Sequence, residues 1–239
     1  MKRSRGPIYL SGLHLAATFA LVVVPLVLLL VVALVTGISP AGLFGDIGVS
    51  TLRLLVAYVV AVVLAWVAAV AFYHGRRAAV ALPIFDVLQS IPSFAALPFA
   101  VYLLGPSNVT VVLFLVLAVI WPIFFSVISS LKQVQSDWQD VARVTDLHGW
   151  RYLWYFLLPI TLPGLVTGSI VGLGEGWEAL VATEIIVGPH AGIGNFFQNV
   201  AHDVTATTLG ILGLLVLIFS INKLIWLPLL ERSHRLTED

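Results

Sequence analysis

Cysteine is absent from the sequence, and charged residues are scarce. Of the 239 residues, 10% are Asp, Glu, Lys or Arg and 60% are apolar, whereas an ordinary soluble domain has about 25% charged and about 45–50% apolar residues. Without cysteine the chain has no disulfide framework, no thiolate nucleophile and no sulfur-ligated metal site. Twelve basic residues balance twelve acidic ones, so no net positive field attracts nucleic acid. These shortages exclude a soluble enzyme, a disordered tail and a nucleic-acid-binding protein.

Long charge-free runs predict about six transmembrane helices. A helix needs about 20 mostly apolar residues to cross the hydrocarbon core of a bilayer. The run 87–131 is long enough for two crossings, and the turn-forming residues 105–108 divide it. We therefore expect an all-α, polytopic membrane protein in which 15–231 forms a single transmembrane domain between the segment 1–14 and the tail 232–239. The expected spans are 15–36, 54–73, two within 87–131, 162–187 and 204–230.

The basic residues are distributed asymmetrically about these spans. With six crossings, the side that holds both chain ends and the second and fourth connections carries ten of the twelve: Lys2, Arg3, Arg5, Arg76, Arg77, Lys132, Arg143, Arg151, Arg232 and Arg235. The opposite side carries Arg53, and Lys223 lies in or near the last span. Short basic connections stay cytoplasmic, so we expect both termini in the cytoplasm. The first apolar run is longer than the apolar core of a signal peptide, which usually has about 7–15 residues, and this favours a retained anchor.

The longest polar connection, about 132–159, has the pattern of an amphipathic helix. Ser136 and Gln139 have the spacing of a capping box, and Gly149 is expected to divide the region into two helical pieces. Four apolar residues then fall on one helical stripe: Trp150, Leu153, Trp154 and Leu157. Two interpretations remain open, namely a segment that lies among lipid headgroups and a docking element for a cytoplasmic partner.

Glycines recur every fourth residue in the fifth span. Each step of four residues advances only about 40° around a helix, so the glycines form a narrow strip without side chains. Small residues at this spacing let helices approach closely within lipid, and packing is the interpretation we favour. The alternative is a smooth wall of a transport pathway. The strip consists of Gly164, Gly168, Gly172 and Gly176.

The same span carries three carboxylates, Glu175, Glu178 and Glu184. A carboxylate near the middle of a bilayer costs roughly 2.5–3.5 kcal/mol on insertion scales, so these residues are not expected to face lipid. Glu175 and Glu178 share one face, where they could line a pathway or gate or could pair structurally, for example Glu175 with Lys223. Glu184 points about opposite and is expected to be solvated at the outer interface.

The segment 140–164 resembles the cytoplasmic EAA loop of ABC importer permeases. That loop reads Glu-Ala-Ala, three residues, then Gly, and ends in Leu-Pro before the next span. Here Asp140 stands at the Glu position, Val141 and Ala142 at the Ala positions and Asp146 at the Gly position, with Leu158-Pro159 at the end. Further segments are similar to the nitrate, sulfonate and taurine branch of these permeases: 48–53, 89–92, 174–177, 182–184 and 221–226.

This resemblance implies a type I ABC importer permease fold in the inner membrane of a prokaryote. It implies that two permease subunits, identical or related, form the pathway, that two ATPase subunits grip the loop, and that an extracytoplasmic binding protein delivers the substrate. The implied coupling residues are Asp140, Val141, Ala142, Arg143, Asp146, His148 and Gly149. The implied pathway or gate residues are Glu175, Trp177, Glu178 and Glu184.

The sequence has no P-loop motif for ATP, so we expect a transport subunit without an ATPase site, with ATP and Mg²⁺ used by the partner. It also lacks His-Glu-x-x-His and Gly-x-Ser-x-Gly, which disfavours an intramembrane enzyme, and we expect no metal or cofactor. The branch resemblance favours a small anion such as nitrate, a sulfonate, taurine or bicarbonate. The alternative is an ion-coupled secondary transporter or channel that uses Glu175 and Glu178.

Overall fold

A computed structural model describes residues 12–91, 93–133, 148–188 and 190–230, and no strand occurs in these ranges. The all-α expectation is confirmed. The elements are α1 (Gly12–Val35), α2 (Pro40–Phe72), α3 (Gly75–Gln89), α4 (Ser93–Leu104), α5 (Asn108–Lys132), α7 (Gly149–Tyr152), the π-helical turn η2 (Leu153–Leu157), α8 (Leu158–Val187), α9 (Ile193–Asn199), α10 (Val204–Ile221) and the π-helical turn η3 (Asn222–Trp226).

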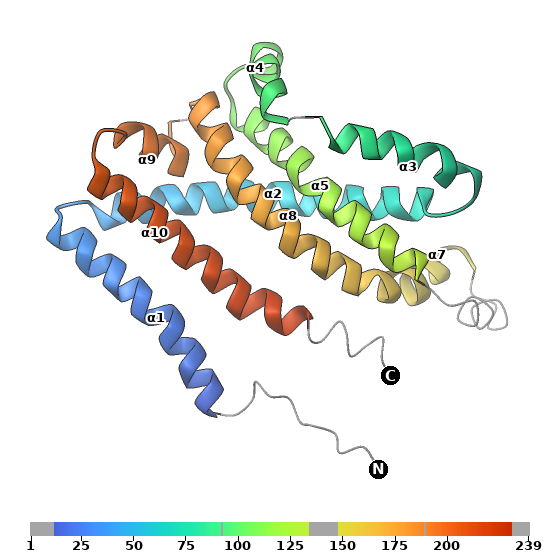
Figure 1. Cartoon of the computed structure of the whole chain (residues 1–239), viewed down its shortest axis with the longest axis horizontal. Helices are drawn as coiled ribbons and strands as arrows, with labels where there is room; N and C mark the ends of the chain where they lie inside the picture. The colour runs from blue at the N-terminus through green and yellow to red at the C-terminus, as the bar shows by residue number, and fades with distance from the viewer. Residues whose placement is uncertain (1–11, 92, 134–147, 189, 231–239) are drawn as a thin grey trace.

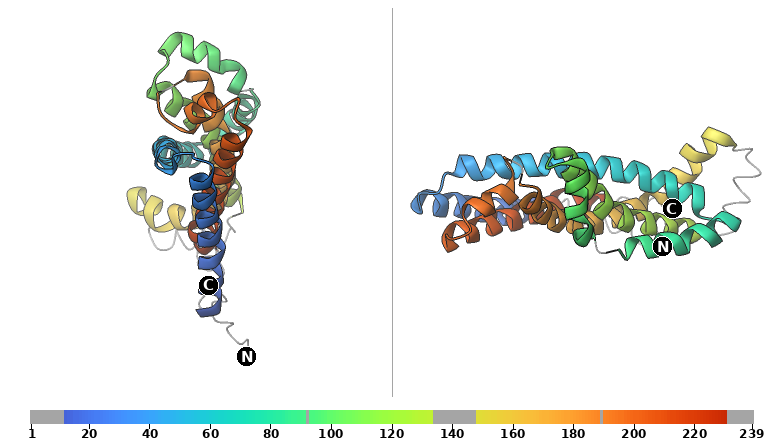
Figure 2. Two further views of the ribbon diagram at one scale, coloured as in Figure 1. Left: turned by 90° about the vertical axis from the view of Figure 1, so that its left-hand side faces the viewer. Right: turned by 90° about the horizontal axis from the view of Figure 1, so that it is seen from above.

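The helices form a flat layer around a central pair, α5 and α8 (Figures 1 and 2). These two helices make the most extensive contact between described elements, and α2 packs against α5. Helix α1 lies beside α10 at the periphery (Figure 1). The main core therefore sits where α2, α5 and α8 meet, and the other helices are attached around it.

The glycine strip of α8 lies against α5. A Cβ added to Gly168 would lie 2.6 Å from the Cα of Ile123, and one added to Gly172 would lie 3.0 Å from the carbonyl oxygen of Val119. Added Cβ atoms at Gly164 and Gly176 would also meet neighbouring helices. The two helices approach through backbone contact that only glycine permits.

Helix α2 uses alanine in the same way that α8 uses glycine. Its buried face carries a fully buried alanine at every fourth position: Ala57, Ala61, Ala65 and Ala69. Two hydrogen bonds then tie α2 to α8, because the hydroxyl of Tyr58 donates to Ser169 Oγ at 2.9 Å and Trp66 Nε1 donates to Thr161 Oγ1 at 2.9 Å. Both bonds satisfy polar groups that lipid cannot solvate.

Helix α2 begins fourteen residues earlier than the expected span 54–73. Ser39 accepts a hydrogen bond from the amide of Gly42, and Pro40 follows at the first helical position, which is a strong helix start. At 33 residues, α2 is about 50 Å long. Arg53 therefore lies inside a helix, and its expected place in the connection before the span is wrong.

The third expected span is not one continuous helix. It begins at Gly75, earlier than expected, and α3 and α4 meet at an angle of 90°. The hydroxyl of Ser90 donates to the carbonyl of Asp86 at 2.8 Å, and Pro92 follows, a residue that has no amide hydrogen to continue a helix. The helical segment therefore breaks between Gln89 and Ser93.

Four described helices are long and apolar enough to cross a membrane: α2, α5, the continuous helix Gly149–Val187, and Val204–Leu230. The bent pair α3 and α4 would add a fifth, and α1 contributes a shorter apolar stretch, Phe19–Val35. Six crossings require both of the latter to span, so the count of six stays a prediction.

We expect Gly168→Ala to destabilise the chain by about 1–3 kcal/mol, as overpacking of a tight contact does. The added Cβ would lie 2.6 Å from Ile123 Cα and 2.8 Å from the carbonyl oxygen of Pro122. Gly174→Ala in the same helix is the matched control, since nothing lies within 4 Å of its Cβ, and alanine favours a helix. Thermal unfolding in detergent, followed by circular dichroism, measures both. Equal unfolding temperatures for the two variants would contradict the packing role.

Candidate functional site

A groove of about 660 Å³ lies between the break of α3 and α4 and the adjoining parts of α5 and α8. Its polar lining consists of Gln89, Ser90, Glu175 and Glu178. Its aromatic lining consists of Phe94, Phe114, Trp121 and Phe125. We call this space the groove; it brings two carboxylates of α8 next to the polar residues at the helix break.

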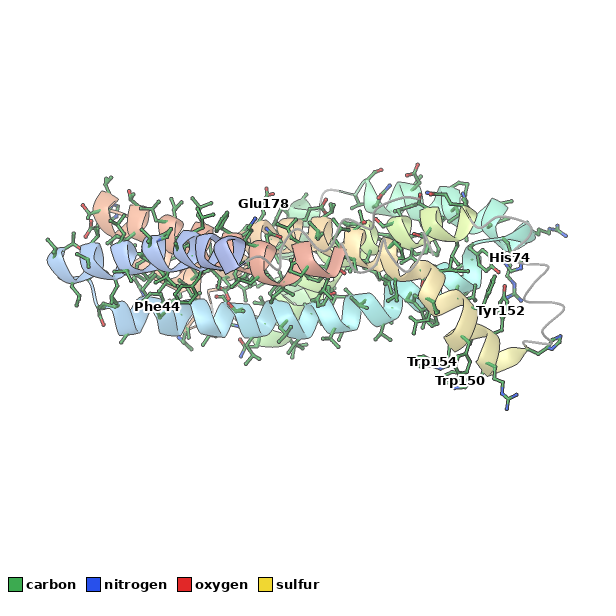
Figure 3. All side chains as sticks on the ribbon, turned by 90° about the horizontal axis from the view of Figure 1, so that it is seen from below. Phe44, His74, Trp150, Tyr152, Trp154 and Glu178 are labelled. Carbon is green, nitrogen blue, oxygen red and sulfur yellow. The ribbon has the colours of Figure 1, made fainter. Side chains whose placement is uncertain are left out.

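Glu175 and Glu178 are exposed to the groove and have no hydrogen-bond or ion-pair partner among the described residues. They are three residues apart in α8, so they lie on one helical face as expected. Figure 3 shows Glu178 at the edge of the molecule opposite α2. The structure thus places these two carboxylates together in a cavity, while the expected pairing of Glu175 with Lys223 is not found among the described contacts.

Trp177 does not line the groove. Its side chain is 7% exposed and belongs to the main core. A step of two residues turns a helix by about 200°, so Trp177 points away from the face that carries Glu175 and Glu178. The resemblance grouped Trp177 with the pathway residues, but the structure places its side chain in the main core instead of the groove.

Glu184 lies in a buried polar cluster on the other side of α8. Its side chain is 0% exposed and forms an ion pair with Arg53 of α2. The hydroxyl of Ser50 is 2.9 Å and 2.8 Å from the two carboxylate oxygens. Arg53 also donates to Asn108 Oδ1, from Nε at 3.0 Å and from Nη2 at 2.7 Å, and to the carbonyl of Ala191 at 2.8 Å. The pair is therefore satisfied on both sides, as a buried ion pair requires.

Three successive backbone amides attach the start of α9 to this cluster. Gly192 adopts φ +122°, which L residues rarely adopt, and a Cβ there would collide with Arg53 and Glu184. The amides of Gly192, Ile193 and Gly194 donate to Asp46 Oδ1, Ser50 Oγ and Glu184 Oε2 at 2.8, 2.8 and 2.9 Å. We call these residues, with Arg53 and Asn108, the Arg53–Glu184 cluster; it joins α2, α5, α8 and α9.

The expectation that Glu184 is solvated at the interface is therefore wrong. Its partner was visible in the sequence as the one basic residue assigned to the side opposite the other ten. A single Arg and a single Glu near the same membrane surface indicate an ion pair once both lie inside helices. Charge-free windows do not show that α2 begins at Pro40. They therefore do not show that Arg53 lies inside a helix, where it can pair with Glu184.

The aromatic segment that precedes α8 projects from the helix layer (Figure 3). It begins at Gly149 with φ +57°. Trp150 and Trp154 are 71% and 49% exposed, whereas Leu157 is buried, so the expected apolar stripe divides into an exposed and a buried part. The π-helical turn at 153–157 adds a residue to the helical turn and shifts the stripe. The exposed tryptophans leave both the lipid and the partner interpretation open.

At the start of this segment, burial and the neighbouring Tyr152 raise the pKa of Tyr73 to about 12. This phenol, at the end of α2, therefore stays neutral at physiological pH.

Of the expected coupling residues, His148 and Gly149 are described at the start of α7. The remaining five lie outside the described residues: Asp140, Val141, Ala142, Arg143 and Asp146. The capping-box residues Ser136 and Gln139 also lie outside them.

No group of three or more His, Cys, Asp or Glu side chains that could hold a metal ion occurs within the described part of the chain. What the arrangement offers chemically is binding. The groove presents negative charge, amide and hydroxyl groups and aromatic faces to a solute. The Arg53–Glu184 cluster is closed by its own partners and serves as a joint between helices.

We expect Glu184→Gln to destabilise the chain by about 3–5 kcal/mol, because breaking a buried ion pair leaves one charge uncompensated. The double variant Arg53→Met/Glu184→Gln should cost less than the sum of the two single variants, since the coupled partners are removed together. Denaturant unfolding in detergent gives the double-mutant cycle. The exposed Asp86→Asn is the control and should stay within about 0.5 kcal/mol of the wild type. Additive effects of the two cluster substitutions would show that the pair carries no coupling.

Comparison with known proteins places the chain among membrane transport proteins. Residues 57–232 match the family described as the binding-protein-dependent transport system inner membrane component. The nitrate import permease protein NrtB of Synechocystis sp. is 33% identical over 141 residues, which are 56% of this chain and 51% of the relative. The taurine transport system permease protein TauC of Escherichia coli is 32% identical over 155 residues, 65% of this chain and 55% of the relative.

The bicarbonate transport system permease protein CmpB of Synechococcus elongatus is 29% identical over 141 residues, 56% of this chain and 51% of the relative. The chain spans about half the length of these curated relatives. The family match covers most of the chain and agrees with the resemblance seen in the sequence. The chain belongs to the inner-membrane components of binding-protein-dependent transport systems, the permeases of ABC importers.

Proposed function

We propose that the chain forms the translocation pathway of an ATP-driven importer for a small solute, of the group that includes nitrate, bicarbonate, sulfonates and taurine. The groove carries this proposal: it places two carboxylates, an amide and a hydroxyl beside a broken helix within an otherwise apolar helix layer. Polar groups at membrane depth are costly, and they commonly mark substrate pathways. The names of the relatives support the solute group.

The proposed assembly contains a second permease subunit, two ATPase subunits that use ATP and Mg²⁺, and an extracytoplasmic binding protein, with both chain termini in the cytoplasm. The coupling residues would be Asp140, Val141, Ala142, Arg143, Asp146, His148 and Gly149. The helix from Gly149 to Val187 is continuous through η2. A displacement of its Gly149 end is therefore passed directly to the groove carboxylates of α8. Because α8 is packed tightly on α5, the two helices would move as one rigid body.

An ion-coupled secondary transporter or a channel is the second candidate. The unpaired carboxylates Glu175 and Glu178 favour it, since such groups serve proton or cation coupling in transporters. This mechanism would leave the coupling residues and the protruding aromatic segment without a role. The two candidates differ in their energy source, so the energy source is the property to measure.

Reconstitution of the chain with its partner ATPase and binding protein should give solute uptake into proteoliposomes that requires ATP. Uptake of labelled nitrate, bicarbonate and taurine is measured with ATP, without ATP, and with an imposed proton or sodium gradient. The control replaces ATP with a non-hydrolysable analogue. Uptake that persists without ATP and follows the ion gradient would refute the importer and support the second candidate.

Replacement of Ala142 with Arg should uncouple ATP hydrolysis from transport while membrane insertion stays normal. A large charged side chain at a docking helix would prevent its fit in the ATPase groove. ATP hydrolysis and uptake are measured on the same proteoliposomes, and Ala142→Ser is the conservative control. Coupling that is unchanged in Ala142→Arg would remove this residue from the docking contact.

A further inference from the structure

The three carboxylates of helix α8 lie in two different environments. Glu184 is fully buried and receives hydrogen bonds from Arg53, Ser50 and the amide of Gly194. Glu175 and Glu178 receive none from the described residues. The fold thus pairs one carboxylate completely and leaves two neighbouring carboxyl groups together in an open cavity. These two groups are available to a ligand.

The lining of the groove has the composition of a site for an organic cation. The lining contains two carboxylates and four aromatic rings, and among the described residues it contains no Lys, Arg or His. Carboxylates repel an anion, while the faces of aromatic rings attract ammonium groups.

The size of the groove points the same way. About 660 Å³ lies in the usual range for sites that hold small organic ligands. Nitrate or bicarbonate would fill a small part of this space and would meet no positive charge among the described lining residues. An aminosulfonate or a related organic ammonium compound can place its nitrogen between the carboxylates and its carbon atoms against the rings.

We propose that the groove binds a solute with a positively charged nitrogen, a zwitterion or an organic cation, and that Glu175 and Glu178 hold this nitrogen. The proposal rests on the proposed function, because it assumes that the groove is the transport pathway. Within the group of solutes named above, it favours the aminosulfonate over nitrate and bicarbonate. Gln89 donates one amide hydrogen to Asp86 and keeps the other to meet the acidic end of a zwitterion.

The test uses two solutes that differ only in the proposed feature. Taurine and isethionate are both ethanesulfonates; taurine carries an ammonium group where isethionate carries a hydroxyl. Choline is the simple organic cation, and sodium nitrate is the inorganic anion. Each is titrated at millimolar concentrations into the purified chain in nanodiscs. Tryptophan fluorescence and thermal stability are both recorded, because a ligand that binds the native state raises the unfolding temperature.

Taurine and choline should change the fluorescence in a saturable way and raise the unfolding temperature, whereas isethionate and nitrate should do neither. Glu175→Gln and Glu178→Gln keep the shape of the side chain and remove its charge. Each should weaken binding of choline on the order of tenfold, because one of the two negative charges that attract its ammonium group is removed. Trp121→Phe should abolish the fluorescence change without abolishing thermal stabilisation, which locates the signal in the groove.

Asp203→Asn is the matched control. It removes one negative charge at the start of α10, outside the groove, and an Asn oxygen can still accept the capping hydrogen bond from Ala206. Binding should equal that of the wild type.

Three results would overturn the proposal: no fluorescence change and no stabilisation with taurine or choline, equal effects of taurine and isethionate, or cation binding that survives both Gln substitutions. These outcomes do not depend on ATP. Failure of ATP-dependent uptake in proteoliposomes, with cation binding in the groove intact, would instead refute the importer function.

Discussion

The close approach of α5 and α8 is the constraint on which the rest of the structure depends. At Gly168 and Gly172 the backbone of α8 lies against Ile123 and Val119 of α5, with no room for a Cβ. In lipid, where apolar side chains gain little by leaving their surroundings, such contacts are a main source of helix association. Helix α2 joins this pair through its alanines and through Tyr58 and the hydroxyl of Ser169. The three helices therefore form one unit whose members cannot rotate independently.

The two faces of α8 that remain outside the α5 contact have different physical roles. One face carries Glu184, whose charge is balanced by Arg53 and whose oxygens are shared with the start of α9. The other face carries Glu175 and Glu178, which open into the groove without partners among the described residues. The ion pair and hydrogen bonds of Glu184 hold the helices that supply its partners in fixed positions. A carboxylate without a partner inside the membrane is costly, and this cost is offset where a bound ligand supplies the opposite charge.

Some of this arrangement follows from the sequence, and some depends on tertiary contacts. The four-residue period of the glycines predicts a strip, and a helical wheel places Glu175 and Glu178 opposite Glu184; both agree with the structure. The partner of the strip does not follow from the strip itself, because α2, α5 and the helix that contains α10 are all long and apolar. A search for charge-free windows places Arg53 at the end of a span and so does not reveal that it lies inside α2. The same helical wheel places Trp177 away from the face of Glu175 and Glu178.

The walls of the groove differ in how firmly they are held. Two walls belong to α5 and α8, whose backbones are in contact. The third is the α3–α4 pair, in which α3 has no buried residue and α4 buries Leu97 among its described side chains. Parting α5 from α8 would expose a glycine strip and break a packed core, whereas moving the bent pair breaks few buried contacts. Movement of α3 and α4 is therefore the change of lowest cost that widens the groove. Under the proposed coupling, a push along the helix that begins at Gly149 would move the α5 and α8 walls together past this third wall. The tight α5–α8 contact and the broken α3–α4 pair are therefore complementary. Rigid motion of α5 and α8 widens the groove only if α3 and α4 can be displaced relative to them.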